Sequence, residues 1–319
     1  MATSDEISGL VVKTQGDRYT VHTPVGLFVS RLRGRLKKER QLTDLVAVGD
    51  RVSLSVIGEA AGVIEAVLPR ERVLSRQAPG SGGRSGQRRP PAEREQVILA
   101  NPDQAVFVFA VADPAPRLGM LDRFLVIAEE AAIPAVVCAN KVDLLPEAQT
   151  RAVFGLYETL GYPVLYTSAR AWLGLEALRE RLRDRISVLT GPSGVGKSSL
   201  LNALQLGLGR AARAISRATQ KGRHTTAVSE LLALDFGGWV ADTPGLRALA
   251  PWDIEPAELD GYFVEIGPLV SRCEFSDCTH VHEFGCAVRA AVAAGSVARS
   301  RYESYLKLRS DAASQPNTK

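Results

Sequence analysis

The sequence predicts a multidomain protein with an N-terminal all-β barrel, a central α/β domain and a small C-terminal helical domain. Strand-like segments recur at roughly 8–12-residue spacing over the first seventy residues, as in small barrels. From residue 105 to about residue 242, buried strands alternate with helices. Three of the four cysteines then fall within fourteen residues near the C-terminus. A length of 319 residues fits two or three domains.

The composition places the chain in the globular class, with 45% hydrophobic and 23% charged residues and a net charge of +4. Residues 1–6 include two acids and no apolar run, so we expect no signal peptide. No stretch approaches the ~18 apolar residues of a membrane span. Four cysteines do not make a disulfide framework. We therefore expect a cytoplasmic protein that is monomeric and does not associate with membranes.

Four regions follow from changes along the chain. Residues 1–72 form the all-β region, with strands expected at 11–14, 19–22, 27–32, 51–57 and 62–67. Residues 73–96 form a basic flexible linker, because 78–91 hold four Gly, three Pro and three Arg. Residues 97–257 form the α/β domain, and residues 258–319 form the cysteine-containing segment with a basic C-terminal helix. Parallel α/β sheets bind ligands at the carboxyl ends of their strands.

A glycine-rich loop lies between an expected strand at 186–190 and a helix that starts near Ser199. It reads Gly191, Pro192, Ser193, Gly194, Val195, Gly196, Lys197 and Ser198, which matches G-x-x-x-x-G-K-[ST]. Glycines allow backbone N–H groups to surround phosphate oxygens, and the helix N-terminus adds positive potential. We expect Lys197 to reach the β- and γ-phosphates of a nucleotide and Ser198 to bind Mg²⁺.

Two further motifs predict that the nucleotide carries guanine. Asn140, Lys141, Val142 and Asp143 follow the expected strand at 135–139. A carboxylate from Asp143 would accept both guanine N–H donors, and Asn140 would contact the Hoogsteen edge. Adenine would leave these polar groups unpaired, which argues against an ATPase. After the strand at 164–167, a backbone N–H from Ser168 or Ala169 would meet the guanine O6.

The remaining nucleotide motifs concern Mg²⁺ and the γ-phosphate. The strand at 239–241 is followed by Asp242-Thr-Pro-Gly245. We expect Asp242 to hold Mg²⁺ through water and the Gly245 amide to contact the γ-phosphate; alone, the motif is equally typical of a turn begun by proline. Thr226, or its neighbour Thr225, is the expected second hydroxyl that senses Mg²⁺.

These elements resemble those of the Ras-like GTPases, but their order differs. Ras-like proteins place the phosphate loop first, whereas here the N-K-V-D and T-S-A motifs precede it. The resemblance implies a circularly permuted GTPase domain with the same sheet. Permutation also predicts that the segment after Gly245 leads straight into the C-terminal domain, so that hydrolysis could pull on that domain directly.

The usual water-orienting glutamine after D-x-x-G is replaced by Leu246. Either turnover is slow until a partner acts, or another residue orients the water. His224, in the loop expected to cover the γ-phosphate, is the candidate catalytic residue. A solvated loop histidine without a catalytic role is the alternative.

The cysteine cluster indicates a metal. Cys273, Cys278, His280 and Cys286 supply three thiolates and one imidazole, the ligands of a closed structural Zn²⁺ site. Four protein ligands leave no open coordination position for catalysis. His282 is a neighbouring alternative to His280.

Basic residues gather at three places. The expected barrel has a run with one intervening acid, and its first members would alternate onto one strand face. This run comprises Arg31, Arg33, Arg35, Lys37, Lys38 and Arg40. Linker arginines 84, 88 and 89 and the C-terminal residues Arg299, Arg301, Lys307 and Arg309 add to it. We interpret the run as an RNA-binding surface of an OB-like barrel; a solvated charge run is the alternative.

The complete pattern resembles the ribosome small subunit-dependent GTPase A family, from about residue 9 to residue 308. The motif order and the Cys273/Cys278/His280/Cys286 knuckle carry the resemblance. It implies a GTPase that binds the small subunit and its 16S rRNA during late 30S maturation, with turnover stimulated by the subunit. In the family, a switch-loop histidine corresponds to His224. The alternative is an RNA-binding assembly protein that uses GTP as a conformational ligand. The insertion at 78–91 and the residue Pro102 depart from the family pattern.

Overall fold

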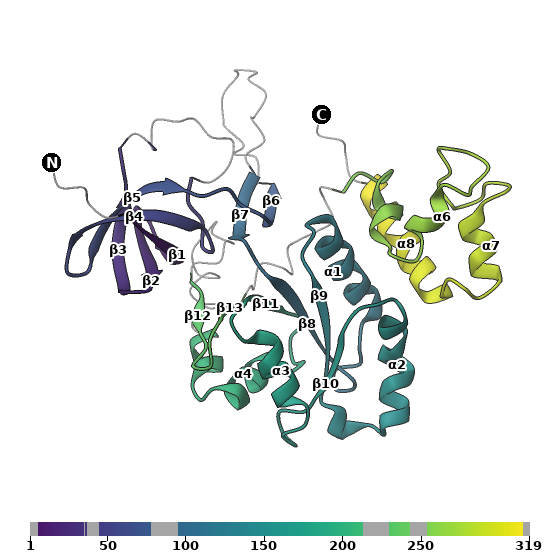
Figure 1. The fold of residues 1–319 in the computed structure, drawn as a ribbon. Coiled ribbons are helices and arrows are strands. Elements are labelled where there is room, and N and C mark those ends of the chain that lie inside the picture. The colour runs from purple at the N-terminus through teal and green to yellow at the C-terminus, as the bar shows by residue number, and fades with distance from the viewer. Residues whose placement is uncertain are drawn as a thin grey trace, which may run out of the picture. The chain divides into compact units, whose positions relative to one another are not determined.

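The computed structural model describes residues 6–34, 36, 45–77, 95–212, 230–242 and 254–314 (Figure 1). The chain divides into two compact units. The first comprises Met1–Gln104, Leu178–Thr190 and Ser198–Leu246; the second comprises Ala105–Ala177, Gly191–Lys197 and Arg247–Lys319. Among the described residues, no helix combines the length and the apolar character needed to cross a membrane.

The first unit contains a closed five-stranded barrel in the order β1-β2-β3-β5-β4. Its strands are β1 (Glu6–Gln15), β2 (Arg18–Thr23), β3 (Gly26–Leu32), β4 (Arg51–Gly58) and β5 (Ala61–Val67). Strand β3 runs parallel to β5, and the other described pairs are antiparallel. Alternating side chains fill the interior, including Val11, Val21, Leu54 and Ile64. This topology matches the expected OB-like barrel.

A set of buried contacts joins the barrel to the segment of the chain that follows it. Strands β6 (Val73–Gln77) and β7 (Glu95–Ala100) pair antiparallel. All of β6 and the first two residues of β7 lie in the stretch 73–96 that was expected as a linker, and the rest of β7 lies in the stretch assigned to the α/β domain. Asn101 accepts a hydrogen bond from the Glu71 N–H at 2.8 Å and donates to the Gly49 carbonyl at 3.1 Å. Gly49 has a φ of 89°, and a Cβ there would lie 2.0 Å from the Ala100 oxygen. Only glycine fits this close approach.

In the first unit, the barrel also contacts a group of strands that come later in the chain. Strand β11 (Ile186–Thr190) pairs in parallel with β13 (Trp239–Asp242), and β12 (Leu232–Ala233) pairs antiparallel with β13. Lys13 of β1 forms an ion pair with Glu230 at 2.8 Å. The Trp239 ring lies edge-on to His22, with the ring centroids 5.1 Å apart.

The second unit contains three parallel strands in the order β10-β9-β8. These are β8 (Gln104–Ala110), β9 (Ala135–Asn140) and β10 (Val164–Thr167). Every residue of β8 and β9 is buried, as expected for parallel strands covered on both faces. Helix α1 (Leu118–Glu130) packs on β8 through Phe124, which stacks on Phe107 with the centroids 5.5 Å apart. Helix α2 (Glu147–Thr159) contacts β9 and β10.

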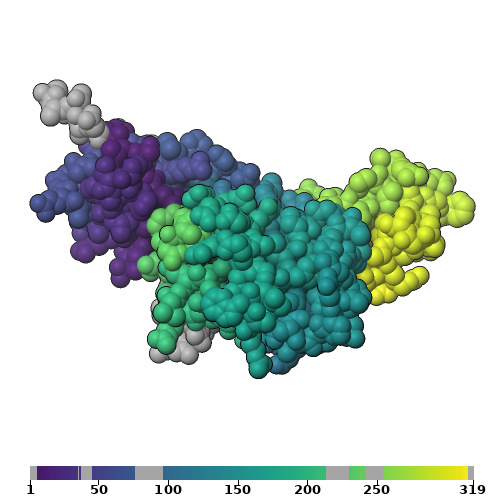
Figure 2. Space-filling model, turned by 60° about the horizontal axis from the view of Figure 1, so that its bottom comes forward, coloured from purple at the N-terminus to yellow at the C-terminus, as the bar shows by residue number. Residues whose placement is uncertain are grey.

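Short helices and one long helix form the C-terminal part of the second unit. They are η4 (Leu259–Tyr262), α6 (Gly267–Val270), α7 (Ala287–Ala293) and α8 (Arg299–Ala313). Their core includes Phe263, Ile266 and Tyr305. In Figure 2 the yellow surface of this part adjoins the teal surface of the same unit, in agreement with the contact between α1 and α8.

A buried charge network fixes α8 to α1. The Arg301 guanidinium donates to Asp122 at 2.7 Å and to both carboxylate oxygens of Glu265 at 2.6 and 3.1 Å. Asp122 also accepts from the Tyr157 hydroxyl at 2.9 Å. The Arg301 side chain is 1% exposed. Its assignment to the basic surface was therefore wrong, because its charge is neutralised inside the protein.

Candidate nucleotide site and metal centre

The glycine-rich loop curls around the end of its own lysine. Lys197 begins helix α4 (Lys197–Leu204), and its Nζ donates to the Gly191 carbonyl at 2.7 Å and the Pro192 carbonyl at 2.8 Å. Gly191 has a φ of 150°, and a Cβ there would lie 2.0 Å from the Val108 oxygen. The strand end thus requires glycine. The result is a loop whose lysine points back over the residues expected to hold phosphate.

The Asn140 side chain ties the guanine motif to this loop. Its Nδ2 donates to the Val195 carbonyl at 2.8 Å, and its Oδ1 accepts from the Thr167 hydroxyl at 3.1 Å. The residue is 1% exposed. The sequence assigned Asn140 to the Hoogsteen edge of guanine, whereas its described contacts are with the loop and with β10. Thr167 was missed as a partner, although its position opposite Asn140 in the β9–β10 register reveals it.

Asp143 and Ser168 form the other polar pair at this edge. The Ser168 hydroxyl donates to Asp143 Oδ1 at 2.5 Å and accepts from the Ala171 N–H at 3.0 Å. Asp143 is exposed, while Ser168 is buried. Lys141 has a φ of 64°, and its Nζ donates to the Asp113 carbonyl. The carboxylate of Asp143 therefore faces solvent in a fixed position, with an oxygen available for ring N–H donors.

Several predicted site residues lie outside the described residues. These are His224, Thr225, Thr226, Gly245, Arg35, Lys37, Lys38 and Arg40. Asp242 ends strand β13, and Ser198 and Ser199 lie in the first turn of α4. On the barrel, Arg31 lies 3.7 Å from Asp17, and Arg33 forms a 2.8 Å ion pair with the buried Glu65. Both arginine side chains remain more than half exposed.

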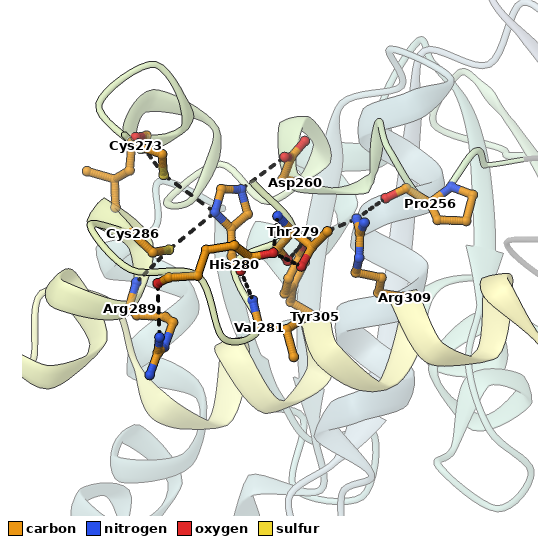
Figure 3. Close-up of polar contacts among 12 residues, drawn as sticks. Pro256, Asp260, Cys273, Thr279, His280, Val281, Cys286, Arg289, Tyr305 and Arg309 are labelled. Carbon is orange, nitrogen blue, oxygen red and sulfur yellow. Dashed lines mark hydrogen bonds and ion pairs between the residues drawn. The ribbon is translucent and has the colours of Figure 1, made fainter. Parts of the chain in front are cut away.

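Three cysteines and one histidine converge in the C-terminal part of the second unit. Figure 3 shows Cys273, His280 and Cys286 of this cluster. The ligand atoms of Cys273, Cys278, His280 and Cys286 all lie within 4.8 Å of one another. His280 Nδ1 lies 3.5 Å from the Cys273 sulfur and 3.4 Å from the Cys286 sulfur. Such separations match tetrahedral coordination with metal–sulfur distances near ~2.3 Å. His280 is buried, whereas His282 is exposed, which decides between the two histidines.

Binding of a cation to this cluster would be coupled to the loss of a thiol proton. Burial, together with hydrogen bonds to the neighbouring thiols, raises the pKa of Cys278 to about 12. A free thiol in this position would therefore stay protonated at neutral pH, and only a bound cation would hold it as thiolate. The donor set of three sulfurs and one imidazole fits Zn²⁺.

Two acidic residues organise the cluster, and the sequence motifs did not identify either of them. The Asp260 carboxylate lies 3.1 Å from His280 Nε2, on the side of the ring opposite the cysteines. Glu283 accepts the N–H groups of Thr279 and Val281, both at 2.9 Å. Burial tends to raise the pKa of Glu283, but hydrogen bonds from the Thr279 hydroxyl and from backbone N–H groups, including those of Thr279 and His282, lower it overall. Glu283 therefore holds the turn that presents His280.

Helix α8 supports the same turn from below. The Tyr302 hydroxyl donates to the His280 carbonyl at 2.6 Å, and the Tyr305 hydroxyl donates to the Thr279 carbonyl at 2.9 Å. His280 has a φ of 61°, an unusual backbone conformation for a residue with a side chain. These contacts keep the ring facing the cysteines.

Comparisons with known proteins agree with this architecture. A family described as RsgA GTPase matches residues 83–252, and one described as RsgA N-terminal domain matches residues 8–64. The chain is 46% identical over 307 residues to the small ribosomal subunit biogenesis GTPase RsgA of Gemmatimonas aurantiaca, covering 95% of this chain and 97% of that protein. It is 39% identical to the protein of the same name from Thermotoga petrophila, covering 94% and 95%.

Two solved structures share the fold. The crystal structure of YjeQ from Thermotoga maritima has a TM-score of 0.77 at 38% identity and covers 97% of this chain and 99% of its own. That of YloQ, described as a circularly permuted GTPase, has a TM-score of 0.73 at 29% identity and covers 98% and 97%. The permuted order of the motifs is therefore a property that this chain shares with a solved structure.

Proposed function

Because the chain belongs to the RsgA GTPase family, we propose that it binds and hydrolyses GTP in the biogenesis of the small ribosomal subunit. Its relatives are named for that process. The observation that carries the proposal is the hydrogen bond from Asn140 to the Val195 carbonyl at 2.8 Å, which joins the guanine motif to the phosphate loop. A protein that bound only phosphate would not need a hydrogen bond between these two motifs.

We assign separate groups of residues to the phosphates and to the guanine base of GTP. The backbone N–H groups of residues 191–199 and the Lys197 ammonium would hold the phosphates. Asp143 would accept the ring N–H donors of guanine, and Ser168 or Ala169 would donate to its O6. Ser198, Thr226 (or Thr225) and Asp242 are the proposed magnesium residues, and the Gly245 amide would contact the γ-phosphate. Bound there, Mg²⁺ would neutralise charge on the phosphates.

Hydrolysis needs a residue that orients water, and Leu246 cannot supply it. We assign this role to His224 and propose that the small subunit stimulates turnover. The RNA surface would be the barrel residues Arg31, Arg33, Arg35, Lys37, Lys38 and Arg40, which track phosphates. We further propose that the protein works as a cytoplasmic monomer.

Cys273, Cys278, His280 and Cys286 would hold one structural Zn²⁺, since their number, chemistry and spacing fit that ion. Bound there, Zn²⁺ would cross-link the turns between η4 and α7 and leave no position for a reactive water. Asp260 and Glu283 would orient the ligand residues rather than bind the ion.

Steady-state GTPase assays with and without purified small subunits test the proposal. We expect slow turnover alone and a severalfold or larger increase with subunits. Equal turnover in both assays would favour the alternative in which GTP is a conformational ligand of an RNA-binding protein. Faster hydrolysis of ATP than of GTP would contradict the guanine assignment.

A further inference from the structure

A bulge in barrel strand β1 joins the barrel to the ribbon formed by β12 and β13, all within the first unit. The pairing of β1 with β2 shifts register between Val11 and Lys13, which leaves Val12 as the extra residue of β1. A bulge bends its strand and takes a residue out of the regular ladder. The Val12 carbonyl accepts the Leu231 N–H at 2.7 Å. The bulge thus supplies a backbone acceptor from the barrel to a segment that comes much later in the chain.

Two side-chain contacts accompany this backbone hydrogen bond. The Lys13 ammonium forms an ion pair with Glu230 at 2.8 Å, and the backbones of these two residues also pair antiparallel. His22, on β2, lies edge-on to Trp239 with the ring centroids 5.1 Å apart. The barrel therefore contacts both the residues that precede β12 and the first residue of β13.

Strand β13 has uneven support from its own sheet. On one side it pairs with β11, from Ile186 opposite Trp239 to Leu189 opposite Asp242. On the other side, its partner β12 has only two residues and lies at the edge of the sheet. A short two-stranded ribbon is at best marginally stable alone. Contacts with the barrel should therefore contribute to holding β13 in place.

We propose that Lys13 and His22 are positioning residues for Asp242. Asp242 ends the strand that Trp239 begins, so a displacement of this short strand at its start moves the backbone at its end. The proposal rests on the proposed function, in which Asp242 holds Mg²⁺. Because Mg²⁺ demands nearly ideal octahedral geometry, a small displacement of a residue that holds it weakens binding. The barrel thus has a part in the nucleotide site that is separate from RNA binding.

Nucleotide binding with and without Mg²⁺ tests the proposal in the full chain. The dissociation constant of a fluorescent, non-hydrolysable GTP analogue would be measured in excess Mg²⁺ and in EDTA. For the wild-type protein we expect tighter binding with Mg²⁺, because the ion neutralises charge on the phosphates. The ratio of the two constants is the magnesium gain. A general loss of stability would not lower this ratio selectively.

Charge exchange tests the ion pair. Lys13→Glu should lower the magnesium gain by about threefold or more and change the affinity in EDTA by less than twofold. Combining Lys13→Glu with Glu230→Lys should restore the gain, because the pair re-forms with its signs exchanged. Arg51→Glu is the matched control, since it breaks an exposed 3.4 Å ion pair with Glu71 on the same barrel. Its magnesium gain should stay within twofold of the wild-type value.

Ring substitutions test the aromatic contact. His22→Ala should lower the magnesium gain by about two- to tenfold, whereas His22→Phe should retain it, since phenylalanine keeps a ring against Trp239. Wild-type gains in both Lys13→Glu and His22→Ala would overturn the proposal and leave the proposed function intact. Equal losses of affinity in EDTA and in Mg²⁺ would also overturn it, because they would indicate a purely structural role. If the wild-type protein bound no analogue in either condition, both the proposal and the proposed function would fall.

Discussion

Replacing Arg301 by methionine should destabilise the second unit strongly, because it leaves two carboxylates buried without their cation. Arg301 makes hydrogen bonds of 2.6, 2.7 and 3.1 Å to Glu265 and Asp122 and is 1% exposed. Removing one member of such a buried group costs about 3–5 kcal/mol. At about 2–4 °C per kcal/mol, the midpoint of thermal unfolding should fall by about 6–20 °C.

Differential scanning calorimetry of the full chain would measure the shift, with Arg299→Met as the control on the exposed end of the same helix. The control should change the unfolding midpoint by no more than a degree or two. Arg301→Lys should fall between them, since lysine keeps the charge but cannot reach both carboxylates with a planar fork. A shift for Arg301→Met as small as that of the control would refute the reasoning, because it would show that the network contributes no net stability.

Four further predictions concern the metal centre and the nucleotide site. Chelation should expose the three clustered thiols to alkylation. The Cys138 thiol should stay protected, because burial raises the pKa of Cys138 to about 11. Counting alkylated thiols by mass spectrometry checks this, and three reactive thiols before chelation would argue against a bound ion. Asp260→Asn should weaken zinc binding by about 10–100-fold in competition with a chromogenic chelator, with the exposed Glu255→Gln as control. Asp143→Asn should lower GTP affinity at least a hundredfold and favour xanthosine nucleotides, whose ring presents an acceptor where guanine has a donor; retained preference for GTP would sink the assignment. His224→Ala should reduce subunit-stimulated turnover and leave GTP affinity nearly unchanged, and an unaltered stimulated rate would remove His224 from catalysis.

Local patterns predicted the five strands of the barrel, but not which strands pair. The five expected segments correspond to β1–β5, and the OB-like fold and the family are confirmed. Strand β1 nevertheless begins at Glu6, several residues earlier than expected, because its first residues pair with β4. The parallel pairing of β3 with β5 also depends on contacts distant in sequence, which alternation alone does not encode.

The chemistry of the site was predictable where a motif fixes both residue type and spacing. Spacing alone allowed His280 or His282 in the metal cluster, and burial toward the sulfurs distinguishes them. Arg301 was misassigned because its position in a basic C-terminal helix does not show that Asp122 and Glu265 surround its charge. Asp260 escaped notice because a second residue behind a metal ligand has no fixed sequence distance from it.

The buried network also changes what the permuted order implies. From the sequence, the segment after Gly245 was expected to transmit hydrolysis directly to the C-terminal domain. Within the second unit, however, α8 is bound to α1 through Arg301 and Asp122, and α8 in turn supports the metal loop through Tyr302 and Tyr305. A displacement of this domain would either move α1 as well or break the buried network, which would cost several kcal/mol. If the γ-phosphate drives such a motion, we expect α1, α8 and the metal loop to move as one body, and Arg301→Met to uncouple the two helices.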